Sequence, residues 1–331
     1  MGDVRMNKEI VLGFDIGGTK IGVGLVSTDG KILGSRRIEN KDTYPEDILP
    51  QLVKAAQEIT AENNMKVTDT AGFGISAPGP ADVANGILTA PPNNIHWRNV
   101  PILQYLKENL GIPGFFENDA NCGALAEGFF GAGRGVNDFI YLTMSTGIGA
   151  GIVTGGTLVR GTGLYGGEVG HTVLEIHSDR KCGCGMYGCY EAYCSGRNIA
   201  LYLQAKLKDQ PDHPIVKFAG GKVENIDMIA VEKAFRAGDP LAAEVWDEMS
   251  LRNAQAMGIL INTFNPKRLI LGTLAWAIGD IYVDPIKKYL PRFCWQEMLK
   301  DCELVPSELR RDIGSYAGAA AALYFLLHKK F

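Results

Sequence analysis

Residues 14–33 read FDIGGTKIGVGLVSTDGKIL, and residues 138–161 read DFIYLTMSTGIGAGIVTGGTLVRG. Both segments contain an apolar strand, a glycine-rich turn, a second apolar strand, a short turn and a third strand. The shared order indicates an internal duplication. A duplication predicts two lobes with a cleft between them, into which both glycine-rich turns face. A coincidental similarity between two glycine-rich hairpins is the alternative.

Helices and strands alternate after each of these segments, which is typical of an α/β protein. We expect the last helix, which is rich in glycine and alanine, to fold back onto the first lobe. The small lobe would then contain residues 1–120 and 313–331, and the large lobe residues 121–312. The predicted helices cover 45–62, 100–110, 120–130, 196–208, 225–237, 240–265, 281–290 and a last segment from 313, and the predicted strands cover 70–76, 114–118, 268–272 and 302–307.

Length and charge restrict the class of protein. A chain of 331 residues is long enough for two domains, each with its own core. The net charge of −4 and the absence of a lysine or arginine run argue against binding to nucleic acid or to an anionic membrane. The first residues lack the apolar core of a signal peptide, and no apolar run approaches the ~20 residues that span a bilayer. We therefore expect a cytoplasmic protein.

The stretch GGEVGHTVLEIHSDRKCGCGMYGCYE, residues 166–191, concentrates metal-binding side chains. Three of its cysteines have the spacing C-x-C-x4-C, and a histidine precedes them by eleven residues. One nitrogen and three sulfurs are the ligands of a closed structural Zn²⁺ site, which would hold this loop. His177 is an alternative ligand, and small buried thiols without a metal are an alternative explanation. The predicted ligands are His171, Cys182, Cys184 and Cys189.

Two glycine-rich turns have the features of a phosphate site. Their exposed backbone N–H groups can form an anion-binding nest. Asp15, at the start of the first turn (residues 15–20), can hold a hydrated Mg²⁺. The second turn, residues 145–149, repeats the arrangement, although glycine pairs are also common in hairpins for structural reasons. Neither turn matches the P-loop or the dinucleotide pattern, so we predict ATP held from both sides by paired hairpins.

Residues 117–121, ENDAN, end an apolar strand and begin a helix. Asn and Asp are favoured at a helix N-cap for structural reasons alone. However, α/β sheets bind their ligands at the carboxyl ends of strands. In phosphoryl transfer to an alcohol, a carboxylate beside the hydroxyl accepts its proton. Asp119 is the candidate for that role.

The motifs DIGGTK, SAPGPAD, ENDAN, STGIGAG, GGEVGH, CGCGMYGCYE and LILG occur in order across essentially the whole chain. Together they resemble the ROK family of sugar kinases and repressors, in the pattern of its glucokinases. The resemblance implies a two-lobed, actin-like (RNase H-type) α/β fold with duplicated βββαβα halves. It also implies ATP-dependent phosphorylation of the 6-hydroxyl of an aldohexose, D-glucose first, with Mg²⁺ as the companion of ATP and Zn²⁺ as a structural ion. A homo-oligomer, dimer or tetramer, is implied as well.

The resemblance also implies roles for single residues. Asp119 would deprotonate the sugar 6-hydroxyl, and His171 would place one ring nitrogen on zinc and the other toward the sugar. Thr273 and Ser145 stand where many relatives have glycine, which affects the fine geometry of the nucleotide site. The implied sugar contacts are Gly79, Asn93, Asn118, Glu168, His171 and Glu191. The implied nucleotide contacts are Asp15, Gly18, Thr19, Lys20, Thr146, Gly147 and Gly272.

Several functions remain open within this resemblance. N-acetylglucosamine, N-acetylmannosamine, mannose and fructose are alternative acceptors, although His171 in the E-x-G-H element argues against a fructokinase. A sugar-responsive transcriptional repressor is the alternative from another class. Repressors of the family carry a helix-turn-helix segment before the first lobe, and only fourteen residues precede Asp15 here. We therefore expect an enzyme.

Overall fold

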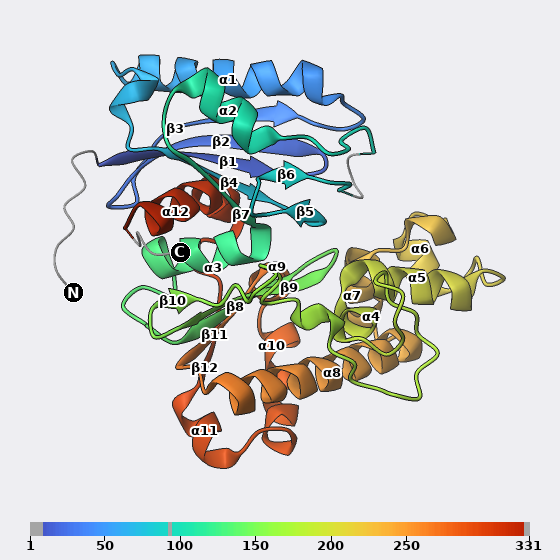
Figure 1. Ribbon diagram of the computed structural model, residues 1–331. Helices are drawn as coiled ribbons and strands as arrows, with labels where there is room; N and C mark the ends of the chain where they lie inside the picture. The colour runs from blue at the N-terminus through green and yellow to red at the C-terminus, as the bar shows by residue number, and fades with distance from the viewer. Residues whose placement is uncertain (1–8, 92–94, 328–331) are drawn as a thin grey trace.

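The computed structural model describes residues 9–91 and 95–327, and it contains two five-stranded mixed sheets (Figure 1). The first sheet has the strand order β3-β2-β1-β4-β7. Its first three strands are antiparallel neighbours, while β4 and β7 run parallel to β1. The strands are β1 (Ile10–Ile16), β2 (Lys20–Ser27), β3 (Ile32–Glu39), β4 (Phe73–Ala77) and β7 (Gly114–Asn118).

The second sheet repeats this topology with the order β10-β9-β8-β11-β12. Again an antiparallel hairpin unit is followed by two strands parallel to its first strand. The matching order confirms the duplication and the two-lobed fold expected from the two glycine-rich segments. The strands are β8 (Phe139–Met144), β9 (Ile148–Thr154), β10 (Thr157–Leu158), β11 (Arg268–Leu271) and β12 (Glu303–Pro306).

Two helices lie between the sheets in Figure 1, α3 (Asp119–Phe130) and α12 (Ile313–Leu327). Helix α12 packs on the first sheet, α3 packs on β8 and β9, and the two helices pack on each other. Small residues allow the approach of α12, because a Cβ added to Gly74 would lie 2.1 Å from the carbonyl oxygen of Gly318. The interior between the sheets is therefore formed by helices contributed from both halves.

The outer helices complete each half. Helices α1 (Pro45–Glu62) and α2 (Ile102–Leu110) cover the outer face of the first sheet, with the apolar side of α1 buried at i, i+4 spacing. The long helix α8 (Pro240–Phe264) lies in the second half. The other helices there are α4 (Tyr190–Cys194), α5 (Gly196–Leu207), α6 (Pro214–Phe218), α7 (Met228–Arg236), α9 (Thr273–Ile278), α10 (Asp280–Tyr289) and α11 (Gln296–Asp301).

Three local expectations need correction. The expected glycine and proline loop after β4 contains a small hairpin of β5 (Ala81–Asp82) and β6 (Ile87–Leu88). The helix expected over 225–237 begins only at Met228, because the Asp227 side chain caps it by accepting from the Ala230 N–H at 2.9 Å. The short helices α4, α6, α9 and α11 were not predicted, since five or six residues show too little periodicity.

In the described residues, no helix has both the length and the apolar character needed to cross a membrane.

Candidate functional site

Asp15 lies at the carboxyl end of β1, where the parallel strands of the first sheet end together. Ser76 is its partner in the register of β4, and the Ser76 hydroxyl donates to Asp15 Oδ1 at 2.9 Å. Burial raises the pKa of Asp15 to about 7 against the opposing effect of the Ser76 hydrogen bond, and the charge of Asp119 adds to the rise. A Cβ at Gly314 of α12 would lie 2.6 Å from Asp15 Oδ2, so glycine leaves room for this carboxylate.

Asp119 begins α3 near the same edge. Its side chain is accessible to solvent, yet enough protein surrounds the carboxylate to remove much of its hydration. This burial raises the pKa of Asp119 to about 6. The hydrogen bond from the Ala120 N–H, at 2.8 Å, opposes the rise, and the negative charge of Glu168 adds to it. A solvent-accessible carboxylate with a pKa close to neutrality has the properties of a general base.

Asn118 has a structural task at this position. Its Oδ1 accepts from the Ala120 N–H at 2.9 Å and from the Asn121 N–H at 3.4 Å, so it is the N-cap of α3. The N-cap alternative is therefore confirmed for Asn118. It is compatible with a binding role, because capping uses the amide oxygen and leaves the amide nitrogen of the side chain for another partner.

The first glycine turn is held by a residue that sequence analysis missed. Asn40 is fully buried at the end of β3. Its side-chain amide donates to the Gly17 carbonyl at 2.7 Å, and its backbone N–H donates to the Thr19 carbonyl at 2.8 Å. Thr43 donates in turn to Asn40 Oδ1 at 2.6 Å. The available signal was a single asparagine directly after the third strand of the hairpin unit.

The second glycine turn contacts a carboxylate from α4. Glu191 Oε2 accepts from the Ile148 N–H at 2.9 Å, and a Cβ at Gly147 would lie 2.9 Å from the same oxygen. The other oxygen, Oε1, lies 3.8 Å from Cys182 Sγ. Glu191 therefore connects the second turn to the cysteine cluster.

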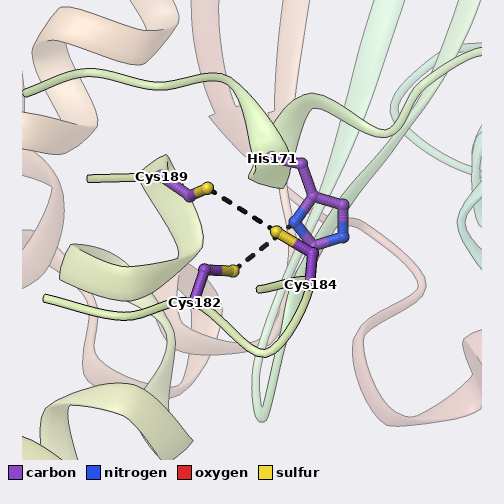
Figure 2. A group of neighbouring side chains, drawn as sticks. All are labelled: His171, Cys182, Cys184 and Cys189. Atoms are coloured by element: carbon purple, nitrogen blue, oxygen red, sulfur yellow. Dashed lines mark hydrogen bonds between the residues drawn. The ribbon is translucent and has the colours of Figure 1, made fainter. Parts of the chain in front are cut away.

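Figure 2 shows the predicted metal ligands gathered around one point. The ligand atoms of His171, Cys182, Cys184 and Cys189 all lie within 4.8 Å of one another. Cys184 Sγ and Cys189 Sγ are 3.8 Å apart, and His171 Nδ1 is 3.6 Å from Cys182 Sγ. A tetrahedral Zn²⁺ with Zn–S bonds of about 2.3 Å places neighbouring ligand atoms about 3.8 Å apart. The four side chains therefore fit Zn²⁺, with His171 rather than His177 as the nitrogen ligand.

His171 presents its second nitrogen to a carboxylate. Nδ1 faces the cysteines, while Nε2 lies 3.8 Å from Glu168 Oε2. The chain around the cysteines turns at Gly185 and Gly188, whose φ angles are +95° and +74°. A Cβ at Gly188 would also lie 1.9 Å from the Glu175 carbonyl oxygen. The cluster thus orients the imidazole toward Glu168, the same residue whose charge reaches Asp119.

The other predicted site residues have fewer contacts that link them to the acidic residues and the Cys/His cluster. Gly79 follows β4 in a position where an added Cβ would meet no atom within 4 Å. Thr19, Lys20 and Thr146 are exposed, and Gly18 and Gly147 are partly buried. Gly272 lies against β8, donating its N–H to the Leu142 carbonyl at 2.8 Å, so packing alone requires a glycine there. Asn93 lies outside the described residues.

Comparison with known proteins shows which family has this sequence and fold. The sequence profile of the ROK family matches residues 11–324. The chain belongs to the ROK family. The glucokinase of Thermotoga maritima is 35% identical over 318 residues, which cover 95% of this chain and 98% of that enzyme. The xylose repressor of Caldicellulosiruptor bescii, also similar, is 28% identical over 87% of this chain and 72% of the repressor. ROK relatives thus include both enzymes and regulators.

Solved ROK structures share the fold over nearly the whole chain. The ROK hexokinase from Thermus thermophilus superposes with a TM-score of 0.83 at 29% identity, covering 97% of this chain and 100% of that one. The ROK glucokinase from Streptomyces griseus, in complex with glucose and AMPPNP, has a TM-score of 0.75 at 30% identity and covers 95% and 98%. The fold prediction is therefore confirmed, and these homologues are sugar kinases.

Proposed function

We propose that this protein is an ATP-dependent kinase that transfers the γ-phosphoryl group to the 6-hydroxyl of an aldohexose, with D-glucose as the main acceptor. The observation that carries the proposal is Asp119, an accessible carboxylate with a pKa of about 6 beside a second acid, Asp15. The similarity of this chain to ROK glucokinases supports the same activity. One of these glucokinases is in complex with glucose and a nucleotide analogue.

The proposed chemistry takes place at Asp119. Its carboxylate accepts the proton of the 6-hydroxyl as the oxygen attacks phosphorus, while ADP departs. Glu168 and the His171 Nε2 lie on the neighbouring loop and hold further sugar hydroxyls. We assign the remaining sugar contacts to Gly79, Asn93, Asn118 and Glu191.

The nucleotide would lie against the two glycine turns. Backbone N–H groups of the turns hold phosphate oxygens. Asp15 would hold Mg²⁺, which would supply positive charge to the phosphates. We propose that residues 1–120 with 313–331, and residues 121–312, close on the substrates as two bodies and exclude water that would compete with the sugar. The proposed nucleotide contacts are Asp15, Gly18, Thr19, Lys20, Thr146, Gly147 and Gly272.

The Cys/His cluster would hold a structural Zn²⁺. Burial raises the pKa of the Cys182 thiol to about 12, and a bound cation would favour the thiolate instead. All four ligand positions come from the protein, so this ion supports the loop and takes no part in phosphoryl transfer. Its contribution is to fix the tautomer and orientation of His171.

An acceptor panel tests the proposed substrate. ADP release with Mg–ATP should give the highest kcat/KM for glucose, compared with mannose, fructose, N-acetylglucosamine and N-acetylmannosamine. A higher value for an N-acetylated sugar would contradict glucose but retain a sugar kinase. Turnover of none of the five by zinc-loaded protein would contradict the kinase, and a gel-shift assay would then test sequence-dependent DNA binding.

The pKa of Asp119 predicts the pH profile of the reaction. A base works only when ionised, so protonation of Asp119 should lower kcat/KM about tenfold per pH unit below about pH 6, and protonation of Asp15, whose pKa is about 7, should steepen this limb. Glu168→Gln removes a negative charge that raises this pKa, so the acidic limb should move to lower pH. Kinetics from pH 5 to 8 measure the limb in both proteins. An unchanged limb in the variant would contradict the coupling of Glu168 to Asp119.

A further inference from the structure

A buried ion pair includes Glu117, which lies two residues before the candidate base, Asp119, in the sequence. Glu117, in β7, is fully buried, and its Oε2 lies 2.7 Å from Nε of Arg160. The Arg160 side chain is only 15% exposed. Arg160 follows β10, so the pair joins the first sheet to the second half of the chain. Neither residue belongs to the proposed sugar or nucleotide contacts.

Glu117 also holds the start of α3. Its second oxygen, Oε1, accepts from the Asn118 N–H at 2.9 Å and from the Asn121 side-chain amide at 3.0 Å. These two donors flank Asp119 in the sequence. One buried carboxylate therefore holds the backbone just before the candidate base and a side chain just after it.

The loop that leads to Glu168 begins at Arg160 and is closed by backbone atoms. The Arg160 carbonyl oxygen accepts from the Gly166 N–H at 2.8 Å, which closes the loop 160–166 on itself. A Cβ at Gly166 would lie 3.0 Å from the same oxygen, so the closure is tight. The Arg160 guanidinium also lies over the ring of Phe325 in α12, 5.1 Å from its centre. Arg160 is thus held by Glu117, Phe325 and Gly166, and Glu168 follows the end of the closed loop by two residues.

We propose that Glu117 and Arg160 are positioning residues that fix the spacing between Asp119 and Glu168. The pair connects the end of β7, which is followed by Asp119, to the start of the loop that leads to Glu168. This inference rests on the proposed role of Asp119 and adds that its placement depends on a contact between the two halves of the chain. Buried pairs are often no more stabilising than apolar replacements, so we assign this pair a role in geometry rather than in stability.

Three variants separate positioning from stability: Glu117→Gln, Arg160→Met and the double variant. Each single change leaves one buried group without its charged partner, so Tm should fall. The double variant removes both charges, so Tm should recover. The spacing is still lost, so kcat for the hexose should stay about 10- to 100-fold below wild type in all three, the size of loss that small misplacements cause. Glu308→Gln, which breaks the exposed Arg134–Glu308 pair, is the control and should leave kcat unchanged.

A second readout does not depend on kinase activity. The pKa of Asp119 can be measured by carboxyl ¹³C NMR titration of the zinc-loaded protein without substrates. The charged groups near it are Asp15, Glu168 and the Glu117–Arg160 pair. If the pair sets the spacing to Glu168, the pKa should fall below its value of about 6 in the double variant, whose Tm has recovered, while burial still keeps it above 3.8.

Either of two results would overturn the inference. One is a double variant that regains wild-type kcat together with its Tm, and the other is an unchanged Asp119 pKa in that variant. If the wild-type protein phosphorylates no hexose but the Asp119 pKa still shifts in the double variant, the positioning role stands and the proposed activity fails.

Discussion

Replacing Asp119 with Asn should lower kcat for hexose phosphorylation by about 100- to 10,000-fold, which is the usual contribution of a general base. The amide has almost the same size and can still accept the hydrogen bond from the Ala120 N–H, but it cannot take the proton of the attacking hydroxyl. The dissociation constant for the hexose should change little, because the loss is confined to the transition state. Steady-state kinetics and calorimetric titration with the sugar measure the two quantities. A variant that keeps most of its kcat would remove Asp119 from the mechanism.

Stability provides the control for this substitution. The folded-state pKa of Asp119, about 6, lies above the ordinary value of 3.8, so the folded protein binds this proton more tightly than the unfolded chain does. The associated stability is fully present below pH 3.8 and is lost as the pH rises through about 6. At pH 8 the ionised carboxylate therefore opposes folding, and Asp119→Asn should leave Tm equal to or above that of wild type. A large fall in Tm would mean that lost activity reflects damaged structure.

Cys184→Ser should abolish stoichiometric zinc binding and raise the KM for the hexose strongly. Structural Zn²⁺ can supply on the order of 10 kcal/mol of folding free energy in small zinc peptides. Losing one of three thiolates releases His171 from the metal, and its Nε2 then no longer faces Glu168 in a fixed orientation. Metal analysis of the purified variant and the KM for glucose measure the effect. Wild-type zinc content and KM would contradict the assignment of the cluster.

The rest of the loop has anchors of its own, so unfolding should remain local. The Arg180 guanidinium lies over the rings of Tyr193 and Tyr202, at 4.5 and 4.0 Å from their centres, and pairs with Glu248. We expect new protease sensitivity between residues 176 and 188 and little change in the main thermal transition. Cys294→Ala changes a buried cysteine outside the cluster and should keep both zinc and KM.

Much of the fold and of the candidate site was predicted from local sequence patterns. The hairpin units around residues 14–33 and 138–161 were recognisable because alternation and turn residues act over a few positions. The ligand set was recognisable because Cys182, Cys184 and Cys189 lie within eight residues of one another. The hairpin of β5 and β6 and the short helices were missed because two to six residues leave almost no periodic signal.

The sequence by itself determined the duplicated α/β plan, the Cys/His cluster and the acidic candidates, since each is read from short segments of the chain. Only the tertiary structure decided how these pieces meet. Asn40 reaches the first glycine turn across 23 residues, Glu191 reaches Ile148 across 43, and Arg160 reaches Glu117 through the packing of two sheets and two helices. Such contacts depend on how strands order and helices pack, and the burial that raises the pKa of Asp119 depends on the same packing. No local pattern contains that information.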